Sequence, residues 1–294
     1  LTGHGETDLN DQVTDLIAKG NMELQELSLL SEGSVPEDAD GVVINGATSD
    51  LSADETEMLQ TYLSGGGNLV VLLTYTEEDM SNLEGLLDNY GMTVGDGVVM
   101  EGDTNYYYGT PLTILPEIVS HSITADVYLD GTPAMLVNMV PLTQKSEVRS
   151  SLSLSTLMET SDSAFAKAVE GGRISSYEME DGDVQGVYAG AILAEEDLGD
   201  DETASVLVFA TSNLLSEEIS QQFNVSNEDL FIDGLSYLCK AEGSTTSIDA
   251  KSMDLTYLSP SMAQVNILAG LYIVVIPAGL LIIGFVVWFR RRKR

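Results

Sequence analysis

A run of 23 residues near the C-terminus, 267–289, contains no charged residue and leads directly into Arg-Arg-Arg-Lys-Arg at 290–294. At about 1.5 Å per residue, a helix of this length spans about 34 Å, against roughly 30 Å for the hydrocarbon core of a bilayer. Tyr272 and Trp288 lie near its two ends, as aromatic residues do at membrane interfaces, and Pro277 predicts a kink. The run predicts a transmembrane helix, because a core helix of this length usually keeps a polar face.

Charge is distributed unequally on the two sides of this run. Residues 290–294 hold five of the 12 Lys and Arg residues, so the rest of the chain carries seven basic and 47 acidic residues, a formal charge of −40. A basic cluster beside a span stays cytoplasmic, so we expect the tail inside the cell membrane and the acidic region outside. The chain opens at Leu1 without an initiating Met. We interpret it as a fragment or processed chain, with a translocating segment upstream.

The composition excludes several classes of function. A strongly acidic surface repels a phosphate backbone, so nucleic acid is not an expected partner. The hydrophobic share of 44% is sufficient for a folded core. One Cys excludes an internal disulfide framework and a Cys-based zinc site, and two His leave little for a His-rich metal centre. We therefore expect neither a metal nor a cofactor.

The outer region alternates between strand and helix patterns. Apolar runs at 41–46, 68–74 and 204–211 lack the alternation of a half-exposed strand and predict central parallel strands. Further strands are predicted at 22–29 and at 184–193, the latter paired with 204–210 around an acidic loop. Four helices are predicted. The first covers 7–20 with Asp8 as N-cap, and the second begins at the capping box Ser52–Glu55 and ends at Gly65–Gly67. The third lies around 83–90, and the last is capped by Ser226.

This alternation predicts an α/β fold with a mainly parallel sheet flanked by helices. We expect one extracytoplasmic domain at 1–250, with a possible division near 130. A polar connector at 251–266 then reaches the transmembrane helix at 267–289 and the cytoplasmic basic tail at 290–294.

Several short motifs follow one another along almost the whole chain. They are Leu-Thr-Gly-His-Gly-Glu at 1–6, Pro-Glu-Asp-Ala-Asp at 36–40, Leu-Ser-Gly-Gly-Gly-Asn-Leu at 63–69, Tyr-Gly-Met at 90–92, His-Ser-Ile-Thr at 121–124 and Val-Phe-Ala-Thr-Ser-Asn at 208–213. In this order they resemble the auxiliary, extracytoplasmic component of ABC-type transport systems, the group that includes the gliding-motility protein GldG.

The resemblance implies a glutamine-amidotransferase-like or flavodoxin-like α/β fold. It also implies an ABC-2-type permease and an ABC ATPase as partners, with no established chemistry. One departure is Thr211, which stands where the family usually has Asp before the Ser of its last motif. Any role of that Asp is in doubt for this chain.

Polar residues follow several of the predicted parallel strands. His4 and Glu6 are expected to follow a first strand, and Asn45, Thr74 and Ser212 follow later ones. The carboxyl ends of parallel strands meet at one edge of a sheet, where doubly wound folds bind ligands. These five residues are therefore the predicted lining of a ligand-binding crevice. The alternative is that they are turn and cap residues that satisfy the local backbone.

Catalysis is not expected, because no nucleophile is set in a recognisable pattern. Cys239 ends an amphipathic helix, and its position predicts a small core residue. The Gly-x-Ser-x-Gly motif that marks a nucleophilic Ser does not occur. His121 precedes Ser122 without an acid that marks a triad. The loop from Asp181 begins like an EF-hand, but Ile192 takes the position of the bidentate Glu.

Two further segments have open interpretations. The acidic run 195–202 is either a solvated loop or a weak calcium site, and Tyr106–Tyr108 is either an exposed patch or buried under its own loop. The sequence thus predicts a membrane-anchored, non-catalytic accessory subunit of an ABC-type transport or gliding-motility complex. A stand-alone surface module that binds a saccharide or peptide is the alternative, and a hydrolase or amidotransferase is the third possibility.

Overall fold

The computed structural model describes residues 1–169, 171–174, 176–200, 202–239, 288 and 292. The chain divides into two compact units, Leu1–Ser244 and Thr245–Arg294. The predicted connector lies outside the described residues, as do the predicted span apart from Trp288 and the basic tail apart from Arg292. No helix within the described ranges is long and apolar enough to cross a membrane.

The first unit has an α/β fold. In chain order its elements are α1 (Asp11–Lys19), α2 (Leu29–Glu32), β1 (Val42–Asn45), α3 (Ala53–Ser64), β2 (Asn68–Leu72), α4 (Ser81–Asn89), β3 (Met92–Val94), β4 (Val98–Met100), β5 (Thr113–Ile114), β6 (Glu117–Ile118), α5 (Ala125–Asp130), β7 (Leu136–Val137), β8 (Leu142–Gln144), β9 (Leu152–Glu159), β10 (Phe165–Lys167), β11 (Val184–Gln185), β12 (Ala189–Gly199), β13 (Glu202–Phe209), the 3-10 helix η1 (Ser212–Leu215), α6 (Glu217–Gln222) and α7 (Asn227–Leu238).

The main sheet has the strand order β1-β2-β13-β12-β9-β6. β1, β2 and β13 run parallel, with Val70 of β2 opposite both Val43 and Leu207. β12, β9 and β6 join in antiparallel fashion. The prediction of a mainly parallel sheet is therefore wrong in its second half, because β12 and β13 form a hairpin and a hairpin requires antiparallel strands.

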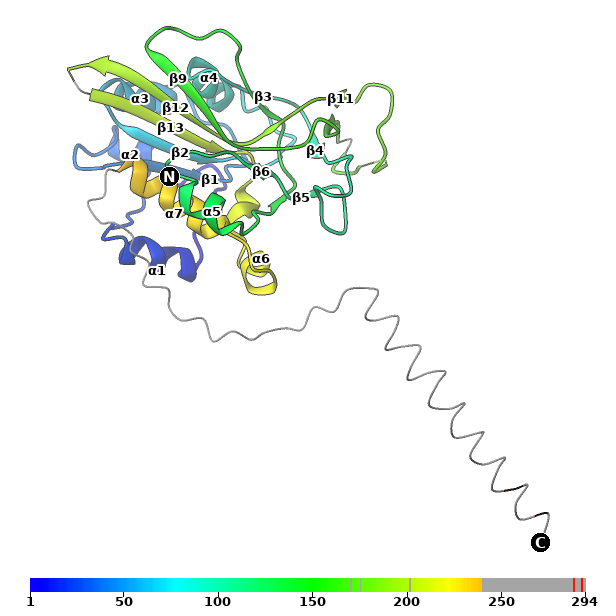
Figure 1. Ribbon diagram of the computed structural model, residues 1–294. Helices are drawn as coiled ribbons and strands as arrows, with labels where there is room; N and C mark the ends of the chain where they lie inside the picture. Colours follow the sequence, from blue (N-terminus) through cyan, green and yellow to red (C-terminus); the bar gives the residue numbers. More distant parts are fainter. Residues whose placement is uncertain (170, 175, 201, 240–287, 289–291, 293–294) are drawn as a thin grey trace. The chain divides into compact units, whose positions relative to one another are not determined.

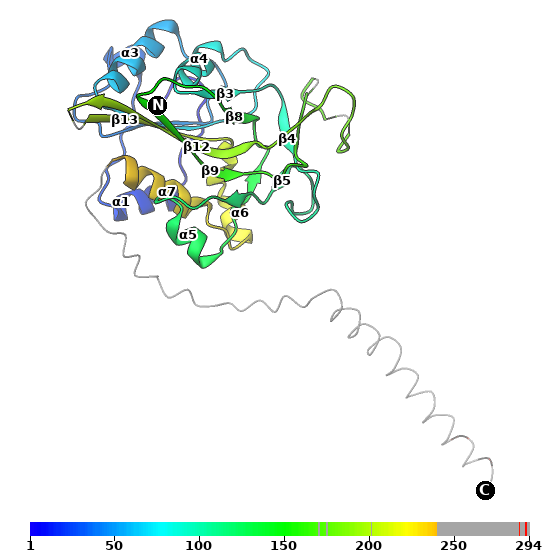
Figure 2. The ribbon, with the colours of Figure 1, turned by 45° about the horizontal axis from the view of Figure 1, so that its top comes forward.

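Helices cover both faces of this sheet. Figures 1 and 2 show α3 and α4 on one face and α1, α5 and α7 on the other. β2 and β13 are interior strands, and Leu69–Leu72 and Ala204–Phe209 are buried. This burial on both faces explains their continuous apolar sequences. β1, predicted to be central, is one of the two edge strands of the described sheet, and β6 is the other.

The predicted helix ends are confirmed where the cap uses the expected side chain. Ser52 and Glu55 form a reciprocal capping box at α3, and the helix ends at Gly65. The predicted N-cap of α1 is wrong by two residues, because Asn10, not Asp8, accepts the hydrogen bond from the Val13 N–H. The short sheets β11-β10-β4, β3-β8 and β5-β7 lie in the chain segments between β3 and β11.

Candidate functional site

The three parallel strands end together, as the sequence predicts. Backbone hydrogen bonds join the turns after them: the Gly46 N–H donates to the Leu72 carbonyl at 2.8 Å, and the Leu73 N–H donates to the Phe209 carbonyl at 2.9 Å. The Ser212 N–H in turn donates to the Leu73 carbonyl. This edge of the sheet holds the five residues predicted from the sequence, but they fall into three groups with different surroundings.

His4, Glu6 and Glu55 form a buried ionic cluster at this edge. The His4 Nδ1 lies 3.1 Å from Glu6 Oε1, and Nε2 lies 3.1 Å from Glu55 Oε2. Both carboxylate side chains are more than nine-tenths buried. Burial alone would raise the pKa of Glu55, but hydrogen bonds from the Ser52 backbone and hydroxyl, and then His4, outweigh it and lower that pKa. The cluster fixes the N-terminal segment against α3.

Asn45 and Ser212 lie against the backbone of neighbouring segments. The Asn45 amide nitrogen donates to the Thr7 carbonyl at 2.8 Å, while its buried Oδ1 has no partner among the described residues. Gly46 has a left-handed backbone with φ of 67°, and a Cβ there would stand 2.9 Å from the Ser212 Cβ. The turns after β1 and β13 therefore pack too closely to leave a ligand space between Asn45 and Ser212.

Thr74 lies in a pocket of about 660 Å³ at the same edge of the sheet. The pocket has a buried apolar floor, made by Ala47, Leu72, Leu73, Met80, Leu83 and Val140. Its rim carries the exposed carboxylates Glu77, Glu78, Asp79, Glu84 and Asp96. Burial, followed by the nearby charges of Asp96, Asp79 and Asp50, raises the pKa of Glu84. No Lys or Arg lines this pocket in the described part of the chain.

The wall of this pocket opposite β2 comes from the segment after β10. Ala168, Val169 and Gly171 line the pocket, and the Gly172 N–H donates to Glu77 Oε1 at 2.6 Å. The preceding Lys167 is buried, with its Nζ 2.8 Å from both Glu180 and Asp183. Lys167 thus pairs with two acidic side chains of the segment after β10 and ties that segment to the end of the strand. The sequence does not predict this wall or the place of Asp96 at the rim, because the pairing of β10 with the distant strand β4 brings both segments to the edge.

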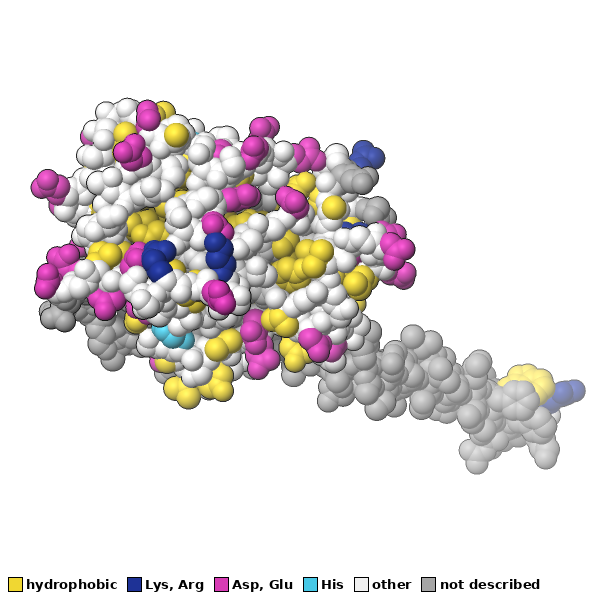
Figure 3. Space-filling model, turned by 90° about the horizontal axis from the view of Figure 1, so that it is seen from above, with side chains coloured by type: hydrophobic (Ala, Val, Ile, Leu, Met, Phe, Trp, Pro, Cys, Tyr) yellow, Lys and Arg dark blue, Asp and Glu magenta, His cyan; other side chains and the backbone are white. Residues whose placement is uncertain are grey.

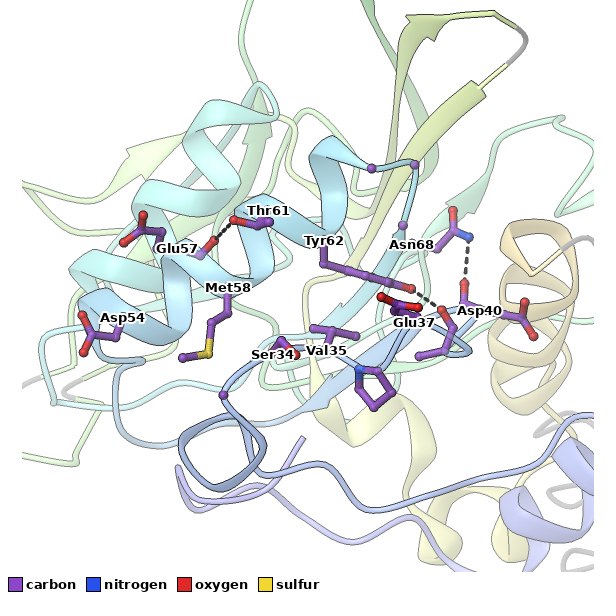
Figure 4. A pocket seen from close by; sticks show the side chains of 16 residues that line it. Ser34, Val35, Glu37, Asp40, Asp54, Glu57, Met58, Thr61, Tyr62 and Asn68 are labelled. Atoms are coloured by element: carbon purple, nitrogen blue, oxygen red, sulfur yellow. Dashed lines mark hydrogen bonds between the residues drawn. The ribbon is translucent and has the colours of Figure 1, made fainter.

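A second pocket, of about 770 Å³, lies at the opposite end of the parallel strands (Figure 4). It is bounded by residues 33–40 and by α3. The Tyr62 hydroxyl donates to the Ala39 carbonyl at 2.9 Å, and the Asn68 amide donates to the Asp40 carbonyl at 2.9 Å. These polar groups hold the loop before β1 to the start of β2. We favour the pocket around Thr74 as the candidate site, because doubly wound folds bind ligands at the carboxyl ends of their strands.

The nucleophiles considered in the sequence are poorly placed for catalysis. Burial, with a further contribution from Asp40, raises the pKa of Cys239 to about 11, so its thiol stays protonated near neutral pH. His121 Nδ1 accepts a hydrogen bond from the Ile123 N–H at 3.2 Å and lies 3.4 Å from the Ser122 hydroxyl. Because the backbone occupies that nitrogen, it is not free to take the Ser122 proton.

The structure also describes the tyrosine run 106–108 and most of the acidic run 195–202. Tyr108 is exposed and its ring packs edge-on against Phe223 at 5.2 Å between centres, whereas Tyr106 and Tyr107 are half-buried. Of the acidic run, residues 195–199 end β12 and Glu202 begins β13. Within the described residues, no three His, Cys, Asp or Glu side chains gather as a metal site requires.

Comparison with known proteins identifies the fold alone. No family model and no curated protein matches the sequence. The structure is similar to one titled "mmIFT52 N-terminal domain", with a TM-score of 0.56 and 14% sequence identity, over 82% of this chain and 96% of that one. A cytoplasmic protein from Salmonella typhimurium, STM3548, aligns with a TM-score of 0.40 and 12% identity over 79% of this chain and 87% of that one. At such identities the first similarity supports an α/β fold and says nothing about activity.

Proposed function

We propose that the chain is a membrane-anchored, extracytoplasmic accessory subunit of an ABC-type transport or gliding-motility complex, and that it acts by binding. The observation that carries the binding role is the pocket around Thr74, at the carboxyl ends of parallel strands. The resemblance of the motifs between residues 1 and 213 carries the assignment to a transport complex. The uncharged run 267–289 and the basic tail support the membrane anchor and its orientation.

The finer fold assignment belongs to this proposal. A glutamine-amidotransferase-like domain normally needs an activated nucleophile beside a base. Here the Cys239 thiol has a raised pKa, and His121 Nδ1 is occupied by the backbone. A glutamine-amidotransferase-like domain that keeps the ligand-binding edge of its sheet but lacks an activated nucleophile fits a binding role.

The pocket favours a particular class of ligand. Its floor is apolar and its rim carries five carboxylates, so a ligand with an apolar part and a neutral or positively charged polar part fits it. A phosphate or a nucleic acid does not, because the rim repels anions. On the face of the molecule that Figure 3 shows, acidic side chains are more numerous than basic ones, so this face also favours neutral or cationic ligands over anions.

The experiment is co-purification from native membranes through an affinity tag fused after Arg294. The proposal expects an ABC ATPase and a polytopic permease in amounts comparable with the tagged chain. Recovery of the chain without either subunit would contradict it and would favour a stand-alone surface binding module.

The pocket is tested separately in the intact complex. Reversing two exposed rim charges, by Glu84→Lys with Asp96→Lys, is expected to lower transport at least tenfold while co-purification persists. The matched control is Glu32→Lys on the exposed surface of α2, which should leave transport unchanged. Normal transport by the pocket variant would show that the pocket is not the binding site.

A further inference from the structure

The pocket between residues 33–40 and α3 has a fixed aromatic wall. The Tyr62 ring lines this pocket, and its hydroxyl donates to the Ala39 carbonyl at 2.9 Å. A Cβ at Gly67 would overlap the Tyr62 ring, so the ring lies directly against the Gly67 backbone. The ring is therefore held both at its hydroxyl and at its carbon atoms. A ligand that contacts it does not have to order a mobile side chain first.

Carboxylates surround the same pocket at both ends. Glu37, Asp40, Asp54 and Glu57 line it and are exposed, and among the described residues none of the four carboxylates has a hydrogen-bond or ion-pair partner. Figure 4 shows Asp54 and Glu57 toward one end and Glu37 and Asp40 toward the other. Along α3, the eight residues from Asp54 to Tyr62 cover about 12 Å. The pocket therefore has negative charge at two places that are separated by more than one turn of helix.

The floor between these ends combines apolar side chains with unpaired backbone groups. Val35 and Met58 line the floor, and Val35 is only 8% exposed. Within the described residues, neither the N–H nor the carbonyl of Val35 makes a hydrogen bond. Buried backbone groups are nearly always paired in folded proteins. Pro36 favours an extended backbone at Val35, and an extended residue directs its N–H and its carbonyl to the same side.

We infer that this pocket binds an extended segment of a partner polypeptide, with a basic side chain at each end of the pocket and an apolar side chain between them. The segment pairs with Val35 as an antiparallel strand does, exchanging N–H and carbonyl hydrogen bonds with one residue. Side chains four residues apart in a strand are about 13 Å apart on one face, which matches the length of α3 between the acidic ends. One basic side chain meets Asp54 and Glu57, and the other meets Asp40 beside the Tyr62 ring, which also attracts a cation.

Charge complementarity selects this occupant over two others. A second copy of the chain has a formal charge of −35 and is repelled by the four carboxylates. A neutral saccharide can stack on the Tyr62 ring, but it leaves those carboxylates without a counter-charge. The pocket lies at the opposite end of the parallel strands from the pocket around Thr74. It therefore adds a second, separate binding surface to the proposed function.

The test measures the binding of dye-labelled peptides with blocked ends to the full chain in detergent micelles, by fluorescence anisotropy. The first peptide is Lys-Ser-Val-Ser-Lys, the second has Gln in place of both Lys residues, and the third carries a methyl group on the Val nitrogen of the first. We expect the first to bind at least tenfold more tightly than either of the others, because the second lacks the charges and the third lacks the backbone donor. Equal affinities for the three peptides would overturn the inference. Undiminished binding of the methylated peptide would contradict the pairing with Val35.

Two variants of the chain locate the bound peptide. Glu57→Lys is expected to weaken binding of the first peptide at least tenfold, since it reverses one charge of the pocket. Asp15→Lys is the matched control, because it makes the same change of charge on the exposed surface of α1, outside the pocket, and should leave the affinity almost unchanged. Equal effects of the two variants would overturn the inference. Binding of a hexasaccharide of N-acetylglucosamine, with no binding of the first peptide, would assign the pocket to a saccharide and contradict it.

Discussion

His4 Nε2 lies 3.1 Å from the carboxylate of Glu55, which joins the N-terminal segment to the first turn of α3. Its other ring nitrogen lies 3.1 Å from Glu6. An imidazole can donate from both nitrogens only when it carries a positive charge. His4 thus contacts both carboxylates, and this part of the sheet edge is a structural centre, distinct from the pocket around Thr74.

Replacing His4 should destabilise the domain. In a His4→Phe variant, Glu6 and Glu55 remain buried without their shared partner, so we expect a loss of about 3 kcal/mol in the free energy of unfolding at pH 7. The measurement is urea denaturation followed by circular dichroism. The matched control is His121→Phe, since His121 is half-buried, and its cost should stay below about 1 kcal/mol. Equal losses for the two histidines would contradict this account.

The same variant should show a defined pH dependence. The folded pKa of Glu55 is lowered, so its stabilising contribution is present above its ordinary pKa and is lost as the pH falls through the lowered folded value. The deficit of His4→Phe should therefore be largest near neutral pH and should shrink toward pH 3. A deficit of the same size at pH 7 and at pH 3 would show that packing, not charge, dominates.

Lys167 should be essential for the segment that walls the pocket. Its side chain is 3% exposed, and Lys167→Met leaves the nearly buried Asp183 without its cation, at a cost of about 3 kcal/mol. Lys145→Met is the control, because the Lys145–Asp88 pair is largely exposed and is worth less than about 1 kcal/mol. Limited proteolysis should cut within 168–183 first in the Lys167 variant. Unchanged cleavage rates in the Lys167 variant would show that Lys167 does not hold this segment in place.

The parts of the fold that the sequence predicted are those fixed by local chemistry. The capping box of α3 and the buried runs of β2 and β13 depend on neighbours close in the chain or on burial on both faces, and both leave a pattern. The pattern at 22–29 predicted a strand that is not formed among the described residues. The pocket wall of Ala168, Val169 and Gly171 depends on the pairing of β10 with the distant strand β4, which leaves no local pattern. Thr74 was found because it follows a buried strand, whereas the role of Glu55 in the His4 cluster was hidden by its role as a cap.

Asp233 on α7 should make the domain less stable at neutral pH. Burial, with Asp229 and Asp126 nearby, raises its pKa to about 6 from 3.8. The ionised form is therefore disfavoured in the fold, and stability rises as the pH falls through 6. We expect Asp233→Asn to gain about 1 kcal/mol at pH 7.5, allowing for the partial exposure of the group, and almost nothing near pH 4. Asp15→Asn on the exposed face of α1 is the control, with no gain at either pH.

The Cys239 thiol should react slowly in the folded protein. With a pKa of about 11, only about one thousandth of the thiol is ionised at pH 8, against about a quarter for an ordinary cysteine. The rate of reaction with a disulfide reagent should therefore rise at least a hundredfold when the protein is unfolded in urea. Comparable rates in the two states would indicate an activated thiol and would reopen the question of catalysis. If the chain is the accessory subunit that we propose, Cys239→Ala should leave transport by the complex unchanged.

The titration of Glu84 in the pocket rim should depend on the charges of the carboxylates around it. Partial burial and the charges of Asp96, Asp79 and Asp50 raise the pKa of Glu84, so removing one of those charges should lower it. We expect the Glu84 carboxyl carbon, followed by nuclear magnetic resonance, to titrate at lower pH in Asp96→Asn than in the parent chain. Glu32→Gln, remote from the pocket, is the control and should leave that titration unchanged. A cationic ligand in the pocket should shift Glu84 in the same direction and release protons on binding, whereas a neutral ligand should release none. A shift of Glu84 to higher pH in Asp96→Asn would show that Asp96 does not act on Glu84 through its charge.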